Sequence, residues 1–302
     1  MNLYSISRAA VLGVTLAIVA CAQGPSKSQT IAPAKAAEPE EKELPIPQEF
    51  KDSTRKEFAL GGLIKTYDDV AWLGTDAVMA AGFKPQDPST TVYVVEPTTN
   101  DLNGIFQFAF ITEAGGKLRV AAMAHIDHHA SGMGKVIDAG VMNPAPEASY
   151  EDARMSAALK AAEQAPGLKF CNATYNHVVL PYLEDGKSEY RVYFLMSSST
   201  KGVVPVGGHI LVRVADDAKT ILEVKPLAKS CGIDPGADDP RAVAIEFTNL
   251  ALDSPSAAQV FLMLRYEKPV YVITKNGFLW GIDSRGIRLL NEGEDKDKSH
   301  AN

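Results

Sequence analysis

The densest group of side chains able to do chemistry in this chain is the run His125-Ile126-Asp127-His128-His129. Successive side chains of a β-strand point to opposite faces, so on a strand His125, Asp127 and His129 would share one face. Imidazole and carboxylate groups that converge in this way can bind a metal ion. The spacing raises a metal-dependent hydrolase as one hypothesis. A polar strand end and loop without a metal explains the same residues and is the favoured interpretation.

The triplet Asp127-His128-His129 resembles one motif of the phosphoesterase family that is named after it. The resemblance implies a two-metal site, which also needs an Asp-x-Asp element at an earlier strand end. No such element precedes residue 125. Gly207-Gly208-His209 is similar to the Gly-Gly-His element of the family, but the alanine-rich continuation is missing. The sequence therefore departs from two of the family's motifs.

Two other kinds of catalytic loop are excluded by their spacing. The segment from Gly132 to Val136 lacks the first Gly of a phosphate-binding loop, and Val136 stands where Ser or Thr would reach Mg²⁺. No Gly-x-Ser-x-Gly segment is present to hold a nucleophilic serine on a strained turn. The sequence thus predicts no cofactor, and an enzyme is the less favoured class.

Aromatic and imidazole side chains in the second half of the chain offer a third hypothesis, a small-ligand-binding domain. They could line a cleft between strands, but residues of this kind are more often half-buried sheet positions, which is the favoured interpretation. These residues are His177, Tyr182, Tyr190, Tyr193 and His209.

The three cysteines of the chain are expected to have two different roles. An exported protein with three cysteines leaves one unpaired, unless that one is modified. If Cys21 is modified, Cys171 and Cys231 remain, and in an oxidising compartment we expect them to form a disulfide. Two separate free thiols are the alternative.

The N-terminus explains the odd cysteine. Arg8 precedes a twelve-residue apolar run, Ala9–Ala20, which fits a signal peptide and is too short to span a bilayer. Ile18-Val19-Ala20-Cys21 resembles the lipobox of bacterial lipoproteins. The resemblance implies cleavage before Cys21 and acylation of that residue. Ala22, where Asp would favour the inner membrane, implies a lipid anchor in the outer membrane, facing the periplasm.

Between the lipobox and the folded region the sequence is polar and rich in proline and glutamate. Residues 21–57 are therefore predicted to be a disordered linker. The chain has 302 residues, 46% of them hydrophobic, which is enough for one or two domains with a sizeable core. It carries 30 Lys and Arg against 37 Asp and Glu, without a basic block, so we expect no nucleic-acid partner.

The first part of the folded region, residues 58–148, reads as α+β. Apolar spacing predicts a helix over Tyr67–Ala81, ended by Gly82. Three strands with turn signals between them follow, at Thr91–Glu96, Ile105–Thr112 and Lys117–His125.

The second part, residues 149–290, opens with a helix and continues as short strands. Ser149 and Asp152 form a capping box for a helix that runs to about Gln164. Asp185-Gly186 and Asn276-Gly277 are dipeptides typical of two-residue hairpins. The predicted strands are Lys169–Leu180, Tyr190–Met196, Ile210–Val214, Thr220–Val224, Val243–Asn249, Gln259–Arg265, Val270–Thr274 and Phe278–Trp280.

Together these patterns predict an α+β fold: a largely antiparallel meander with helices packed on one face. A charged tail, residues 291–302, follows it. The favoured function is a non-enzymatic binding or accessory domain, attached to the membrane by lipid, with an envelope protein as its partner.

Overall fold

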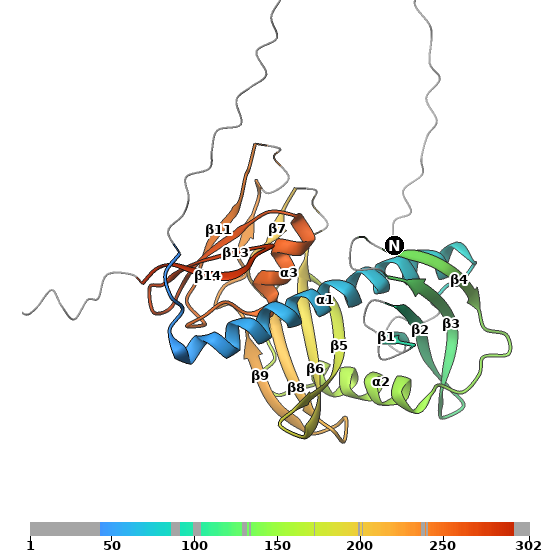
Figure 1. The fold of residues 1–302 in the computed structure, drawn as a ribbon. Helices are drawn as coiled ribbons and strands as arrows, with labels where there is room; N and C mark the ends of the chain where they lie inside the picture. The colour runs from blue at the N-terminus through green and yellow to red at the C-terminus, as the bar shows by residue number, and fades with distance from the viewer. Residues whose placement is uncertain are drawn as a thin grey trace, which may run out of the picture. The chain divides into compact units, whose positions relative to one another are not determined.

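The computed structural model describes residues 43–85, 91–98, 104–128, 132, 134–171, 173–198, 200, 202–236, 239 and 241–292. These residues belong to one compact unit. Within them lie three helices and fourteen strands in four sheets, mostly antiparallel, which confirms the α+β class (Figure 1). Cys21 and the lipobox lie outside the described residues.

The first sheet is an antiparallel meander in the order β1-β2-β3-β4. Its first three strands confirm the sequence prediction. The fourth was not predicted, because its side chains are mostly exposed and show no clear apolar alternation. The strands are β1 (Thr91–Pro97), β2 (Ile105–Ala114), β3 (Lys117–Asp127) and β4 (Lys135–Val141).

The second sheet has the order β5-β6-β8-β9 and is also antiparallel. Asp185 and Gly186 both have positive φ angles, 50° and 75°, as the tight turn between its first two strands requires. Its strands are β5 (Thr174–Glu184), β6 (Lys187–Ser197), β8 (Ile210–Ala215) and β9 (Ile221–Pro226). Two short strands, β7 (Val204–Pro205) and β10 (Ile233–Asp234), pair with each other in a separate two-stranded sheet.

The long helix α1 (Gln48–Ala80) corrects the predicted linker. Residues 48–57, assigned above to a disordered linker, are helical. The reason is that the proline-rich stretch ends at Pro47, which stands at the helix N-cap, and no proline follows until residue 85. The predicted end at Gly82 is correct, since this residue has a φ angle of 98°.

The helix α3 (Ala257–Tyr266) corrects a second prediction, the strand over Gln259–Arg265. A short continuous apolar run fits either a buried strand or a buried helix. Here Ser256 and Gln259 form a capping box, and the Glu57 side chain of α1 accepts a hydrogen bond from the Ala257 N–H at 2.6 Å. Both contacts favour the helix.

Helix α3 joins two parallel strands of the third sheet, whose order is β11-β12-β13-β14. The predicted turn at Asn276-Gly277 precedes β13, and the last strand was not predicted. The strands are β11 (Ile245–Asn249), β12 (Val270–Thr274), β13 (Leu279–Asp283) and β14 (Gly286–Asn291). Of the predicted tail, residues 293–302 lie outside the described residues.

Two hydrophobic cores lie on opposite faces of the first two sheets. In one, α1 packs on Phe108 and Leu180, and this core continues into α3 and the third sheet. In the other, α2 (Tyr150–Glu163) packs Met155 and Leu159 on residues such as Val192. The prediction that helices cover one face only is therefore wrong. The presence of a core on each face also explains why neither face of β5 is exposed to solvent in its middle, where Val178, Val179 and Leu180 are all buried.

The edges of the first two sheets meet at Tyr93 of β1 and His177 of β5. Their rings stack with centroids 3.9 Å apart, and the Tyr93 hydroxyl donates to the His177 carbonyl at 2.9 Å. The His177 Nε2 lies 3.1 Å from the Tyr93 carbonyl oxygen. Burial lowers the pKa of His177 to about 4. His177 is thus part of the seam between the sheets.

Candidate functional site

The predicted metal cluster is not assembled by the residues that the structure describes. The His125 Nδ1 lies 2.8 Å from Asp138 Oδ1, so one of its two ring nitrogens is already hydrogen-bonded to a carboxylate of β4. Asp127 ends β3, and His129 lies outside the described residues. No group of three or more His, Cys, Asp or Glu in the described ranges has metal-binding geometry.

The neighbouring His128 belongs to a buried charged cluster that the sequence did not indicate. Its Nε2 lies 3.6 Å from Asp69 Oδ2 of α1, and Lys65 donates to the same oxygen at 2.5 Å. Asp68 accepts a hydrogen bond from Asn176 at 3.2 Å, and burial raises the pKa of Asp68. Asp68 and Asp69 were overlooked because acidic residues in a surface helix are usually solvated.

The disulfide Cys171–Cys231 is confirmed, with Cα atoms 5.9 Å apart. Gly207 and Gly208 belong to its surroundings. A Cβ on Gly207 would lie 2.3 Å from the Ser230 carbonyl oxygen, and one on Gly208 would lie 2.9 Å from Cys171 Sγ. The two glycines therefore allow the backbone to pass close to the disulfide loop, which is a structural role for the Gly-Gly-His element.

His209 completes this arrangement. Its Nδ1 accepts a hydrogen bond from the Met196 N–H at 3.1 Å, so its Nε2, 3.1 Å from the Pro205 carbonyl oxygen, must carry the proton. Burial lowers the pKa of His209 to about 4, which keeps the ring neutral. Tyr193, another of the five predicted cleft residues, is 1% exposed and lies in the core.

The remaining two predicted cleft residues, Tyr182 and Tyr190, do line an open groove. Its volume is about 460 Å³, and we call it the Tyr150–Tyr190 groove. Three elements form it: the start of α2, the β5–β6 hairpin and the turn after β8. Its lining residues are Tyr150, Glu151, Arg154, Pro181, Tyr182, Leu183, Ser188, Glu189, Tyr190 and Asp216.

Arg154 positions the two tyrosines after which the groove is named. Its Nε donates to the Tyr190 hydroxyl at 2.7 Å and its Nη1 to the Tyr150 hydroxyl at 2.7 Å. Its Nη2 donates to Asp216 Oδ1 at 2.9 Å. The guanidinium carbon also lies 5.2 Å and 5.5 Å from the two tyrosine ring centroids, within cation–π range. One side chain thus joins α2, β6 and the β8–β9 turn.

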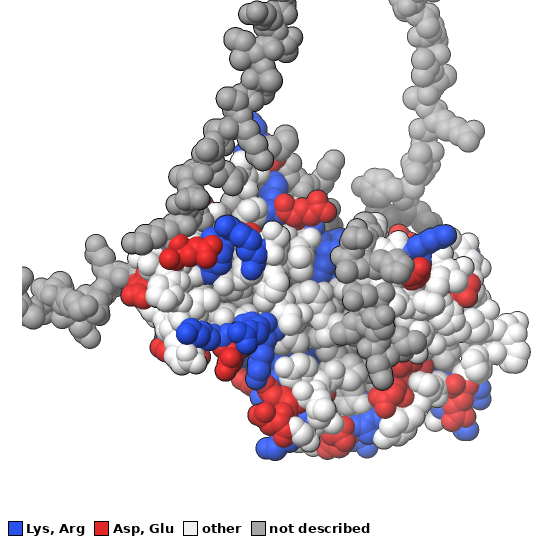
Figure 2. Space-filling model, in the orientation of Figure 1, with Lys and Arg blue, Asp and Glu red and all other residues white. Residues whose placement is uncertain are grey.

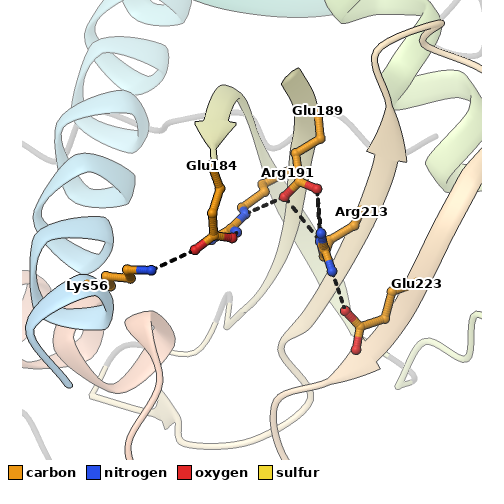
Figure 3. A network of polar contacts seen from close by, with 6 residues as sticks. All are labelled: Lys56, Glu184, Glu189, Arg191, Arg213 and Glu223. Carbon is orange, nitrogen blue, oxygen red and sulfur yellow. Dashed lines mark hydrogen bonds and ion pairs between the residues drawn. The ribbon is translucent and has the colours of Figure 1, made fainter. Parts of the chain in front are cut away.

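A chain of ion pairs supports the groove from the α1 side of the sheet (Figure 3). Glu189 accepts hydrogen bonds from both Arg191 and Arg213. Burial alone would raise the pKa of Glu189, but these hydrogen bonds outweigh it and lower the pKa. The Arg191 guanidinium lies 3.5 Å from the Tyr182 ring centroid. The complete chain is Lys56, Glu184, Arg191, Glu189, Arg213 and Glu223.

The rim of the groove is exposed and apolar. Tyr150 is 71% exposed and Leu183 is 68% exposed. The sequence pattern had not singled out either residue, nor Arg154, because they meet only when α2 packs beside the β5–β6 hairpin. Tyrosine and arginine are enriched in the cores of protein–protein interfaces.

Comparisons of the chain with family models, with curated proteins and with solved structures found no match. Among the described residues, no helix is long and apolar enough to cross a membrane.

Proposed function

We propose that this chain is a lipid-anchored protein of the bacterial cell envelope, held at the outer membrane by acylated Cys21 and facing the periplasm. The lipobox-like residues 18–21 support the anchor. The Cys171–Cys231 disulfide supports an oxidising compartment, since disulfides persist there and are rare in the cytosol. The folded region is a non-enzymatic binding or accessory domain.

The observation that carries the binding role is the Tyr150–Tyr190 groove. Its polar parts are already ordered by Arg154, so little side-chain freedom is lost when a partner binds. Its rim offers two large apolar side chains to solvent. This combination suits an envelope protein that inserts an apolar side chain between Tyr150 and Leu183.

The test is photocrosslinking in intact cells from a photoreactive phenylalanine analogue placed at position 183. We expect one discrete protein adduct, which is lost when Arg154→Ala is introduced into the same chain. The matched control carries the analogue at Val243, which is 83% exposed and does not line the groove. The same adducts from both positions, or none from position 183, would contradict the binding role.

A further inference from the structure

A second groove lies beside the start of α1, and we call it the Lys51–Arg285 groove. Its volume is about 430 Å³. Three of its eight lining residues are basic and, among those described, none is acidic. The lining residues are Ile46, Lys51, Thr54, Arg55, Phe58, Arg285, Gly286 and Ile287. Figure 2 shows Lys and Arg side chains gathered over this end of α1.

The positive charge of this groove is only partly neutralised by neighbouring groups. Arg285 and Arg288 are balanced by Asp283 and Glu43, with nitrogen–oxygen distances of 2.6 to 3.6 Å. Lys51 and Arg55, one helical turn apart on α1, form no ion pair with any described residue and are exposed. The N-terminal end of the helix dipole adds to the positive potential there, and Glu49 in the first turn of α1 offsets part of it.

The floor of the groove is apolar. Ile287 is 8% exposed, and Ile46 and Phe58 are half-buried against the core. The hydroxyl of Thr54 is already used, since it donates to the Phe50 carbonyl at 2.8 Å. A cationic rim above an apolar floor fits a ligand with a phosphate next to hydrocarbon, which is the chemistry of a phospholipid.

The groove also lies where the folded region begins. The Leu44 N–H donates to the Leu289 carbonyl at 2.9 Å, which fixes the chain to β14 two residues before Ile46 enters the groove. Glu43 follows Cys21 by only 22 positions in the sequence. Such a length reaches at most roughly 75 Å when fully extended. An acylated Cys21 therefore keeps this groove close to the membrane.

We propose that the Lys51–Arg285 groove binds the phosphate of an anionic phospholipid in the membrane that carries the anchor. The proposal rests on the lipid anchor of the proposed function. Because tethering raises the effective concentration of lipid to the millimolar range, a weak site is enough to hold the domain against the surface. Docking would fix which face of the domain is turned toward the periplasm.

The test uses the mature chain with Cys21→Ser, exported behind a non-lipoprotein signal peptide so that the disulfide forms and no lipid is attached. Its flotation with phosphatidylcholine vesicles is compared with that on vesicles containing about one-third phosphatidylglycerol. We expect binding to the anionic vesicles only. Each Lys or Arg near an anionic surface contributes about fivefold, so Lys51→Gln/Arg55→Gln should weaken binding roughly 30-fold.

The matched control is Lys187→Gln/Lys219→Gln, which removes two exposed charges with no ion pair to a described residue and leaves the groove intact. We expect less than a twofold effect. Equal binding to both vesicle types, no binding to either, or equal losses in the two double variants would overturn the proposal. Because Cys21 is not acylated here, such a failure leaves the anchor and the Tyr150–Tyr190 groove untouched.

Discussion

At the scale of single residues, Arg154 has the largest local effect on the Tyr150–Tyr190 groove. Its three hydrogen bonds end on three different elements, which are α2, β6 and the turn after β8. Its side chain is 20% exposed, so these bonds are partly shielded from water. The pKa of Arg154 is raised, chiefly by the hydrogen bond to Tyr190. Arg154 therefore stays charged while it orders both tyrosines.

We expect Arg154→Ala to lower the free energy of unfolding by about 1–2 kcal/mol, because hydrogen bonds from a charged donor are lost. Urea denaturation measures the change. Lys160→Ala on the same helix is the control, since among the described residues Lys160 forms a single ion pair, at 3.9 Å, and the substitution should cost less than about 0.5 kcal/mol. Equal losses in the two variants would contradict the role of Arg154.

His209 gives a pH dependence whose sign can be worked out. Its pKa is about 4 in the folded chain, below the ordinary value of 6.5, so the folded state binds fewer protons than the unfolded state. The contribution of His209 to the free energy of unfolding is therefore fully present above about pH 6.5 and is lost as the pH falls toward 4. The loss is about 3 kcal/mol for a shift of this size.

Urea denaturation of the wild type and of His209→Gln, repeated between pH 7 and 4, measures this contribution. Carboxylates and His177 titrate in both proteins, so the difference between the two curves isolates His209. We expect the variant to lose stability less steeply below pH 6.5. Parallel curves would show that His209 is not buried as a neutral ring.

At the scale of elements, the packing of α1 against α3 depends on one glycine. A Cβ on Gly61 would lie 2.3 Å from the Val260 Cβ, whereas a Cβ on the adjacent Gly62 would meet nothing within 4 Å. The two glycines occupy the same helix and differ only in what faces them. They form a matched pair for testing the interface.

Gly61→Ala should destabilise the chain by about 1–3 kcal/mol, because the helices must move apart. Gly62→Ala should stabilise it by about 0.5–1 kcal/mol through helix propensity alone. Thermal unfolding of the two variants checks the prediction. If both substitutions stabilise the chain, α3 does not pack on α1 as described.

The sequence predicted elements well wherever a local signal defined them. The capping box at Ser149 and the turn at Asp185-Gly186 are short-range devices, and both are present. Local pattern failed where tertiary contacts decide. The α3 segment is a nearly continuous apolar run, interrupted only by Gln259 and Arg265, so its cap and its burial against α1 are what distinguish it from a strand.

The candidate site was predicted only in part for the same reason. Tyr182 and Tyr190 were predicted as cleft residues because aromatic side chains on neighbouring strands can line a ligand-binding cleft. Arg154 and Leu183 lie 29 residues apart in sequence, and their meeting depends on how α2 packs beside β5 and β6. The metal hypothesis relied on strand alternation, yet a register shift after His125 and the partner Asp138 changed its geometry.

At the scale of the whole molecule, the Cys171–Cys231 disulfide closes a 60-residue loop that contains the five strands β5 to β9. In the chain-entropy model a loop of this length contributes about 4 kcal/mol. We expect Cys171→Ser/Cys231→Ser to lower the free energy of unfolding by about this amount. Urea denaturation measures it, and an unchanged midpoint would contradict a structural disulfide.

The lipid anchor is the claim on which the proposed location and the membrane-facing groove both depend. Metabolic labelling of cells with radioactive palmitate tests it most directly, by comparing the wild type with Cys21→Ala. We predict a labelled mature wild-type protein and an unlabelled variant that stays at the size of the precursor. A variant that is still labelled, or a wild type that takes up no label, would contradict the account.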